Sequence, residues 1–287
     1  MTRTYVPDPD TFTLTANGLD FACLGWGEAG PLVLLVHGFP DTPHTWDGVG
    51  PRIAALGYRV IAPYTRGIAP TPVPADGAYD SDTQGRDLLA LIEAAGAEDA
   101  VLVGHDWGAS AVYSAAGLAP ERVRKLVAVA IPHPASIKPT LGKAWKVRHF
   151  FSHRLPGAAR RFARDDFAQV RVLYERWSPG FDWPDAEFEA VKNSYSAPGA
   201  CQAALDYYRA FSPKLPPGQR TRLAMPSLVI GGLTDGALGR EDFEASRASF
   251  TGEVEIAMLP GGHFLHREHE EAFLEVLLRF LGEAGAG

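Results

Sequence analysis

Cysteine is scarce in this sequence, which has only Cys23 and Cys201 among 287 residues. Two cysteines so far apart are no disulfide framework, because secreted domains that depend on disulfides carry several closely spaced ones. We expect both side chains to be free thiols in the interior. The first 15 residues lack the basic start and apolar run of a secretion signal, and no stretch reaches the roughly 18 apolar residues of a membrane span. These absences predict a cytoplasmic protein that has no membrane partner.

Basic residues are outnumbered, since 27 Lys and Arg stand against 34 Asp and Glu and give a net charge of −7 at pH 7. A net acidic chain binds polyanions poorly, so we expect no nucleic-acid partner. No phosphate-binding loop of the Gly-x-x-x-x-Gly-Lys type occurs, so we expect no nucleotide and no other cofactor. His266 and His269 stand beside two glutamates. A His-x-x-His pair without a third ligand, on what we expect to be the solvated face of a helix, does not predict a metal site.

The remaining composition is that of an ordinary globular protein, with 46% apolar and 21% charged residues. Continuous apolar runs predict strands that are covered on both faces, and they alternate with helical patterns. The predicted strands are 11–16, 20–25, 31–36, 58–63, 100–103, 125–131, 226–231 and 253–258. The predicted helices between and after them are 44–56, 80–95, 109–119 and 266–281. Such alternation predicts an α/β fold with a mostly parallel, twisted sheet flanked by helices.

The alternation stops in the middle of the chain. Residues 132–219 show no strong strand pattern, but helix-like stretches occur at 141–152, 156–174 and 198–211. We therefore predict an α/β core made of residues 1–131 and 220–287, with residues 132–219 inserted as a helical cap. Ligands of open α/β sheets bind at the carboxyl edge of the strands, so we expect the cap to lie over that edge.

The segment Gly104-His105-Asp106-Trp107-Gly108 joins a predicted strand to a predicted helix. Glycines two residues before and after a central residue are typical of a nucleophile elbow, a strained turn that exposes the central side chain. Serine is the usual occupant, but here it is Asp106, and the chain has no Gly-x-Ser-x-Gly. A carboxylate that attacks an ester gives an anhydride, whereas attack on a saturated carbon with a leaving group gives a stable alkyl ester. Asp106 therefore indicates chemistry on epoxides or alkyl halides, unless it only caps the following helix.

Three other polar segments follow predicted strands. His37-Gly38-Phe39-Pro40 follows the strand at 31–36, Asp235 follows the strand at 226–231, and His263 follows the last strand. The chain order is then nucleophile, acid and base, which is the order of α/β hydrolases.

These motifs together resemble the α/β hydrolases and, within that superfamily, the epoxide hydrolases. The matching segments are HGFP at 37–40, RG-x-x-P-T at 66–71, GHDWG at 104–108, TD at 234–235 and GGHF at 261–264. The resemblance covers almost the whole chain. It implies the α/β-hydrolase fold with a helical cap, and conversion of an epoxide to a vicinal diol through an alkyl ester on the protein.

The resemblance also implies a role for each matching residue. Asp106 would be the nucleophile, His263 the base that activates water, and Asp235 the partner that orients His263. Backbone N–H groups of Phe39 and Trp107 would form the oxyanion hole. The substrates would be a small hydrophobic epoxide and water, and either a monomer or a homodimer is compatible with the sequence.

Opening an epoxide leaves an alkoxide, so a group must donate a hydrogen bond or a proton to the ring oxygen. Epoxide hydrolases commonly use two cap tyrosines for this task. Asp206-Tyr207-Tyr208-Arg209 resembles the segment that carries one of them and implies Tyr208 as a donor. Counting back from the Pro156-Gly157 stretch places His149 at the other position, so a His149/Tyr208 pair is expected.

A dehalogenase is the alternative, because haloalkane and haloacetate dehalogenases use the same Asp-Asp-His set. Trp107 matches the tryptophan that follows the nucleophile in haloalkane dehalogenases. Phe39 stands where these enzymes commonly have asparagine, and Trp107 stands where fluoroacetate dehalogenases have arginine. The sequence therefore favours an epoxide hydrolase. A binding protein without activity would have no need for the base His263.

Overall fold

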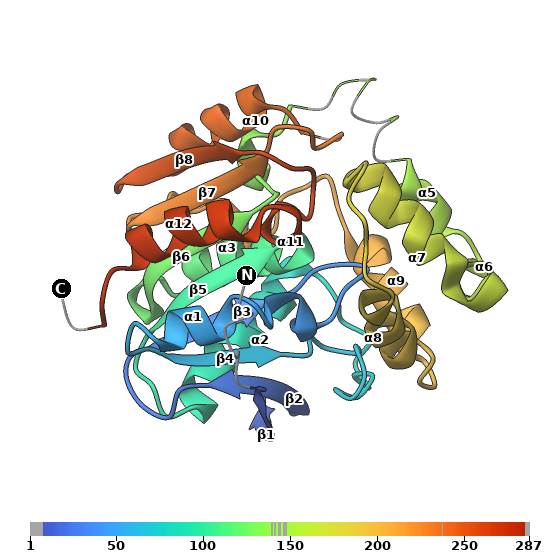
Figure 1. The fold of residues 1–287 in the computed structure, drawn as a ribbon, viewed down its shortest axis with the longest axis horizontal. Helices are drawn as coiled ribbons and strands as arrows, with labels where there is room; N and C mark the ends of the chain where they lie inside the picture. Colours follow the sequence, from blue (N-terminus) through green and yellow to red (C-terminus); the bar gives the residue numbers. More distant parts are fainter. Residues whose placement is uncertain are drawn as a thin grey trace.

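The computed structural model describes residues 8–138, 140, 142, 145, 148–236 and 238–284. Eight strands form one sheet in the order β1-β2-β4-β3-β5-β6-β7-β8 (Figure 1). The strands are β1 (Asp10–Ala16), β2 (Leu19–Trp26), β3 (Leu32–Val36), β4 (Arg59–Pro63), β5 (Ala100–His105), β6 (Val123–Val129), β7 (Ser227–Gly232) and β8 (Val254–Leu259). From β4 to β8 all neighbours pair in parallel, whereas β1–β2 and β2–β4 are antiparallel. The predicted α/β fold with a mostly parallel sheet is confirmed.

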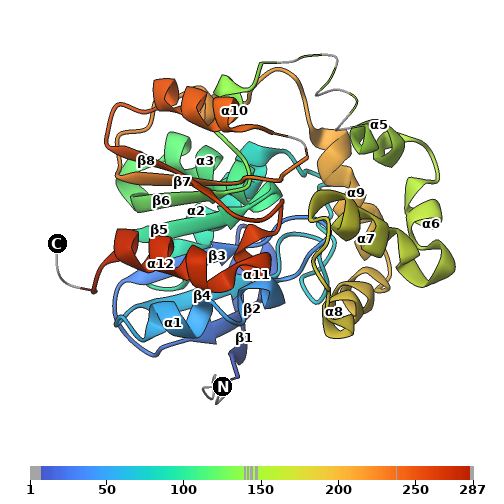
Figure 2. The same cartoon turned by 45° about the horizontal axis from the view of Figure 1, so that its top comes forward.

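Helices cover both faces of the sheet. They are α1 (Gly50–Ala54), α2 (Ser81–Ala94), α3 (Trp107–Leu118), α10 (Arg240–Ala245), α11 (Leu265–Glu268) and α12 (Glu270–Leu281). Strand β3 is buried throughout, and alternate side chains enter two separate cores. Leu34 packs in the core with residues of α2, α3 and α10, and Val33 packs in the core with residues of α1 and α12. Figures 1 and 2 show α1 and α12 together on one face.

Among the described residues between β6 and β7, five α-helices have bounds. They are α5 (His149–Arg154), α6 (Ala158–Phe162), α7 (Arg164–Trp177), α8 (Asp185–Tyr195) and α9 (Ala200–Ala210). Both views show them gathered at one end of the sheet (Figures 1 and 2). The hydroxyls of Tyr174 and Tyr207 donate to the carbonyls of Pro40 and Arg66, which lie in the loops after β3 and β4. These helices therefore cover the carboxyl edge of the strands. Part of the helix predicted at 141–152 lies outside the described residues.

Two predicted helices are broken in the structure. The stretch 44–56 forms a 3-10 turn at Pro43–Trp46 and the short helix α1, because it contains two glycines and Pro51, which has no N–H to donate. The closing helix divides into α11 and α12 at His269, whose backbone has φ −134° and ψ 56°. Both cysteines are free, as expected. Among the described helices, none has the length and apolarity needed to cross a bilayer.

Candidate active site

The predicted site residues lie in loops at the carboxyl ends of parallel strands. Phe39 follows β3, Asp106 follows β5, Asp235 follows β7 and His263 follows β8. Since parallel strands end at the same edge of a sheet, these four loops meet there. The order of the strands in the sheet, rather than their order in the chain, makes them neighbours.

Asp106 occupies a strained turn. Its φ is 54° and its ψ is −117°, a backbone conformation that residues other than glycine rarely adopt. A Cβ on Gly104 would lie 2.3 Å from the carbonyl oxygen of Gly108, and one on Gly108 would lie 2.2 Å from that of Val36. Both glycines are therefore required by close backbone approach. Asp106 makes no side-chain capping hydrogen bond to α3, so helix capping does not explain it.

Asp106, His263 and Asp235 form a continuous hydrogen-bonded set. His263 Nε2 lies 3.3 Å from Asp106 Oδ2, and His263 Nδ1 lies 3.0 Å from Asp235 Oδ2. The side chain of Asp235 is 1% exposed, whereas that of Asp106 is 14% exposed. Asp106 is therefore the carboxylate that a small molecule can reach, and Asp235 is placed to hold the imidazole.

The charges of this set depend on one another. Burial acts to lower the pKa of His263, but hydrogen bonds and charges from Asp106 and Asp235 outweigh it and raise that pKa to about 10. Burial acts to raise the pKa of Asp106, yet its hydrogen bond and charge interaction with His263 hold that pKa below the usual value. At neutral pH the free site therefore contains an ionised Asp106 beside a protonated His263.

The loop after β3 brings a backbone donor to Asp106. The Phe39 N–H donates to Asp106 Oδ1 at 2.9 Å, and the nearby backbone N–H of Trp107 acts to lower the pKa of Asp106. The two N–H groups expected to form the oxyanion hole thus converge on the carboxyl group that would carry the negative charge.

Tyr208, from α9, differs from the other buried tyrosines nearby. The hydroxyls of Tyr174 and Tyr207 donate to backbone carbonyls, and that of Tyr195 accepts from a backbone N–H. The Tyr208 hydroxyl makes no hydrogen bond of this kind to any described residue, and its ring packs edge-on against Trp107 and Phe39. Burial raises the pKa of Tyr208 well above its usual value, so the phenol keeps its proton.

His149, from α5, lies beside Tyr208 with the two ring centroids 5.5 Å apart. It is buried, and no described residue hydrogen-bonds its Nδ1. Burial and the neighbouring His153 lower the pKa of His149 to about 3. The sequence left open whether this residue would donate a hydrogen bond or a proton to the ring oxygen. A neutral imidazole can donate a hydrogen bond, but it is not an acid.

Comparison with known proteins adds the family. A family model for the alpha/beta hydrolase fold matches residues 31–270. The chain belongs to the alpha/beta hydrolase family. An epoxide hydrolase of Caballeronia sordidicola is 29% identical over 94% of this chain and 93% of its own length. Epoxide hydrolase A of Mycobacterium tuberculosis is also 29% identical, over 95% of this chain and 97% of its own.

A solved structure agrees with these relatives. The crystal structure of epoxide hydrolase A from Mycobacterium thermoresistibile superposes on this chain with a TM-score of 0.80 and 24% identity. The match covers 95% of this chain and 98% of that one. At this level of identity the likeness shows the fold. The family match and the sequence relatives together show that this chain is a hydrolase similar to epoxide hydrolases.

The RG-x-x-P-T motif has a structural role in this hydrolase. Arg66 is 1% exposed and makes a two-point ion pair with Asp87, with Nε to Oδ2 at 2.5 Å and Nη2 to Oδ1 at 2.7 Å. Its carbonyl accepts the Tyr207 hydroxyl, so the pair connects the core to α9. None of these interactions connects Arg66 to Asp106, His263 or Asp235.

Two buried histidines near the site were not predicted from the sequence. His153 lies one helical turn after His149, and its ring packs against Phe39 and Tyr208. The i, i+4 spacing of two histidines was the available signal. His266 was expected on a solvated helix face, but this prediction was wrong, because His266 is fully buried against Trp46 and His105. The available signal was its i, i+7 spacing from Phe273, which is also buried.

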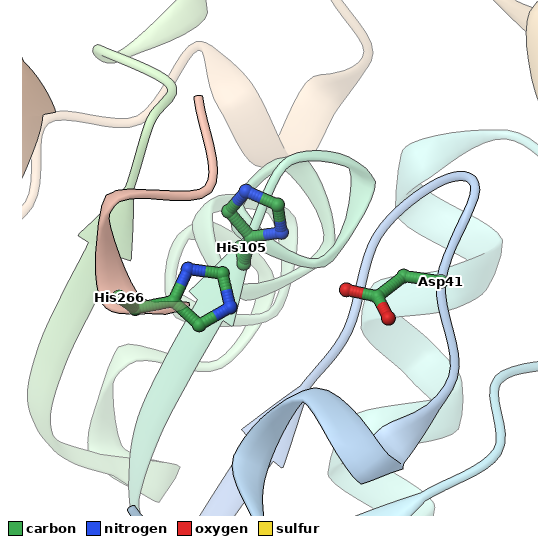
Figure 3. Close-up of side chains that lie close together, drawn as sticks. All are labelled: Asp41, His105 and His266. Carbon is green, nitrogen blue, oxygen red and sulfur yellow. The ribbon is translucent and has the colours of Figure 1, made fainter. Parts of the chain in front are cut away.

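His266 belongs to a cluster that could hold a metal ion or a small polar molecule. One ligand atom each from Asp41, His105 and His266 lies within 4.8 Å of the others. Figure 3 shows the three side chains close together: Asp41 comes from the loop after β3, His105 from the end of β5 and His266 from α11. His269, the neighbour of His266 considered and discounted as a ligand from the sequence, is not part of this cluster.

Proposed function

We propose that this hydrolase converts epoxides to vicinal diols through an alkyl ester on Asp106. The observation that carries the proposal is the placement of an accessible carboxylate, rather than a serine, at the elbow beside His263. A carboxylate forms a stable ester only on a saturated carbon. Relatives named as epoxide hydrolases support this substrate class.

In the first step, a carboxylate oxygen of Asp106 attacks one carbon of the epoxide. The ring C–O bond breaks and its electron pair moves to oxygen, where Tyr208 and His149 donate hydrogen bonds and the Tyr208 phenol supplies the proton. No base is needed, because Asp106 is already ionised. The phenolate is then reprotonated from water.

The ester changes the state of His263. Alkylation removes the negative charge of Asp106, which is one of two carboxylates that raise the pKa of His263. That pKa therefore falls once the ester forms, and His263 can lose its proton and accept one from water. Hydroxide adds to the ester carbonyl, and the Phe39 and Trp107 N–H groups stabilise the resulting oxyanion. Collapse expels the ester oxygen, which takes the proton from His263 and completes the diol. The Asp106 carboxylic acid then returns its proton to His263, so the ion pair is restored and epoxide plus water equals the diol.

We also propose that residues 132–219 act as the cap and that residues 1–131 and 220–287 act as the core. The donors Tyr208 and His149 would then belong to the cap, and the nucleophile Asp106 would belong to the core. The apolar and aromatic neighbours of Tyr208, among them Phe150 and Trp107, favour a hydrophobic epoxide. Cytoplasmic location stays a prediction from the sequence.

A dehalogenase is the second candidate, and one observation favours it. The indole Nε1 of Trp107 is buried and has no hydrogen-bond partner among the described residues. An unpaired buried N–H beside the nucleophile is suited to a departing halide.

Parallel assays decide between the two functions. Diol formation from styrene oxide and halide release from short bromoalkanes would be measured on the same preparation. We expect diol formation and no halide release. Halide release alone would replace the proposal by its alternative, and neither activity in folded protein would contradict both.

A further inference from the structure

The end of α7, in the proposed cap, lies against the loop that carries His263. The carbonyl of Trp177, the last residue of α7, accepts the backbone N–H of His263 at 2.8 Å. The last carbonyls of a helix have no partner within the helix, and here the loop of His263 supplies one. A Cβ on Gly262 would lie 2.3 Å from the Trp177 oxygen, so contact with the cap requires a glycine directly before His263.

Two polar side chains complete this contact. Ser178, directly after α7, is fully buried, and its Oγ accepts the Phe264 N–H at 3.0 Å and donates to Glu268 Oε1 at 2.5 Å. The Glu268 carboxylate also accepts the Gly262 N–H, at 2.9 Å to Oε1 and 3.0 Å to Oε2. Three successive backbone N–H groups, at positions 262 to 264, are therefore held, and the cap supplies the acceptor for two of them.

The backbone of His263 is hydrogen-bonded at both of its polar groups. Its N–H donates to Trp177, and its carbonyl, which can only accept, lies 3.0 Å from His105 Nε2. The indole of Trp177 also packs against the His263 imidazole, with ring centroids 5.4 Å apart, and against that of His149, at 5.0 Å. The end of α7 thus contacts both the backbone and the ring of the proposed base.

We propose that Ser178 is a positioning residue, which acts with Glu268 to fix the end of α7 on the loop of His263 and so determines where the base lies. Neither side chain is hydrogen-bonded to Asp106 or to the imidazole of His263 among the contacts described, so both act through the backbone. Misplacing a catalytic group by about 1 Å can cost about 100-fold in rate. The kinetic part of this role rests on the proposed function, in which His263 is needed only for ester hydrolysis.

The position of His263 is tested first without substrate. Its Nδ1 lies 3.0 Å from Asp235 Oδ2, and a proton in such a buried hydrogen bond exchanges slowly with water and gives a separate downfield signal in NMR spectra. We expect this signal in the wild type at neutral pH. Ser178→Ala should shift or broaden it, because the imidazole moves and its proton exchanges faster. An unchanged signal in folded Ser178→Ala would overturn the proposal.

The kinetic role is tested by measuring the two half-reactions separately with rapid-quench methods. Ser178→Ala removes the acceptor of the Phe264 N–H and the hydroxyl donor to Glu268. We expect it to slow hydrolysis of the Asp106 ester about 10- to 100-fold, while formation of the ester changes little. Glu268→Gln keeps the shape of the side chain but replaces one acceptor oxygen by an amide, so it should slow the same step to a smaller extent. If Ser178→Ala does not fold, Glu268→Gln decides, and unchanged ester hydrolysis in that variant would overturn the role.

A matched control separates positioning from a general loss of stability. Ser194, in α8, is also a buried serine of the proposed cap, but its hydroxyl donates to the carbonyl of Ala69, in the loop after β4. We expect Ser194→Ala to lower stability while the His263 signal and the ratio of the two half-reaction rates stay unchanged. Equal slowing of ester hydrolysis by both serine variants, or equal slowing of both half-reactions by Ser178→Ala, would overturn the role. If neither an epoxide nor an alkyl halide is turned over, the proposed function fails, while the NMR signal still decides whether Ser178 positions His263.

Discussion

His263 Nε2 lies 3.3 Å from Asp106 Oδ2, so the base and the nucleophile of the proposed reaction form an ion pair before substrate binds. In this state His263 is protonated and cannot act as a base. In the proposed reaction, esterification of Asp106 would break the pair by removing one charge, and this change would make His263 basic when water must be activated. The order of the two half-reactions is therefore built into the electrostatics of the pair.

Replacing Asp106 by asparagine should abolish turnover while the fold is retained. The asparagine carbonyl can still accept the Phe39 N–H, but the amide is a poor nucleophile, and loss of a nucleophile typically costs about 10⁴-fold or more. Wild-type turnover in heavy-oxygen water gives the positive test. Since hydroxide adds to the ester carbonyl, mass spectrometry of the Asp106 peptide after a single turnover should find the label there. Label found only in the diol would contradict a covalent ester.

His263→Gln should stop the reaction after its first step. Alkylation needs only the ionised Asp106, whereas hydrolysis of the ester needs a base. Intact-mass spectra should therefore show a stable adduct. An epoxide adds its whole mass, whereas an alkyl halide adds its mass without the halogen, so the same variant distinguishes the two candidate functions. If the folded variant forms no adduct with either an epoxide or an alkyl halide, this result would count against the ester mechanism.

Much of the core could be predicted because it depends on local signals. Strand β3 is a continuous apolar run in the sequence because both of its faces are buried. The glycines around Asp106 indicate the elbow because a Cβ at either position would clash with the backbone. The chain order of Asp106, Asp235 and His263 then indicated a triad, and their side chains are hydrogen-bonded.

The buried surroundings of the site could not be predicted in the same way. His266 was assigned to the solvated face of the closing helix, although its i, i+7 spacing from the buried Phe273 places it on the buried face. The cluster of Asp41, His105 and His266 joins residues more than 60 positions apart along the chain, so no local pattern reveals it. Burial also determines that His149 is neutral, and burial depends on tertiary packing.

Tyr208→Phe should slow formation of the ester, by roughly 10- to 1000-fold, because it removes one positioned donor from the ring oxygen. His149→Phe should act on the same step. Tyr207→Phe is the matched control: that hydroxyl donates to the Arg66 carbonyl, so its loss should cost about 0.5 to 1.5 kcal/mol of stability and leave alkylation unchanged. Rapid-quench measurement of the alkylation rate compares the three. A normal rate in His149→Phe would remove His149 from the proposed donors.

Arg66→Met should destabilise the fold without changing the chemistry. The substitution leaves the buried Asp87 without its two-point partner, and breaking a buried ion pair from one side costs about 3 to 5 kcal/mol. Urea denaturation measures the loss, and activity per folded molecule serves as the control. A loss of activity with unchanged stability would place Arg66 in the reaction instead.

The stability contributed by His263 should depend on pH in one direction. Its pKa is raised from the usual 6.5 to about 10 in the folded protein by Asp106 and Asp235, against the opposing effect of burial. A group whose pKa is higher in the folded state contributes its full stabilisation below the unfolded value and loses it as pH rises through the folded value. The free energy of unfolding of the wild type should therefore exceed that of His263→Gln most clearly below about pH 6.5, and the difference should shrink steadily toward about pH 10. Urea denaturation of both proteins across this range measures the difference. A difference that stays constant or grows with pH would mean that His263 is neutral in the free protein, and that the ester cannot be the event that makes it basic.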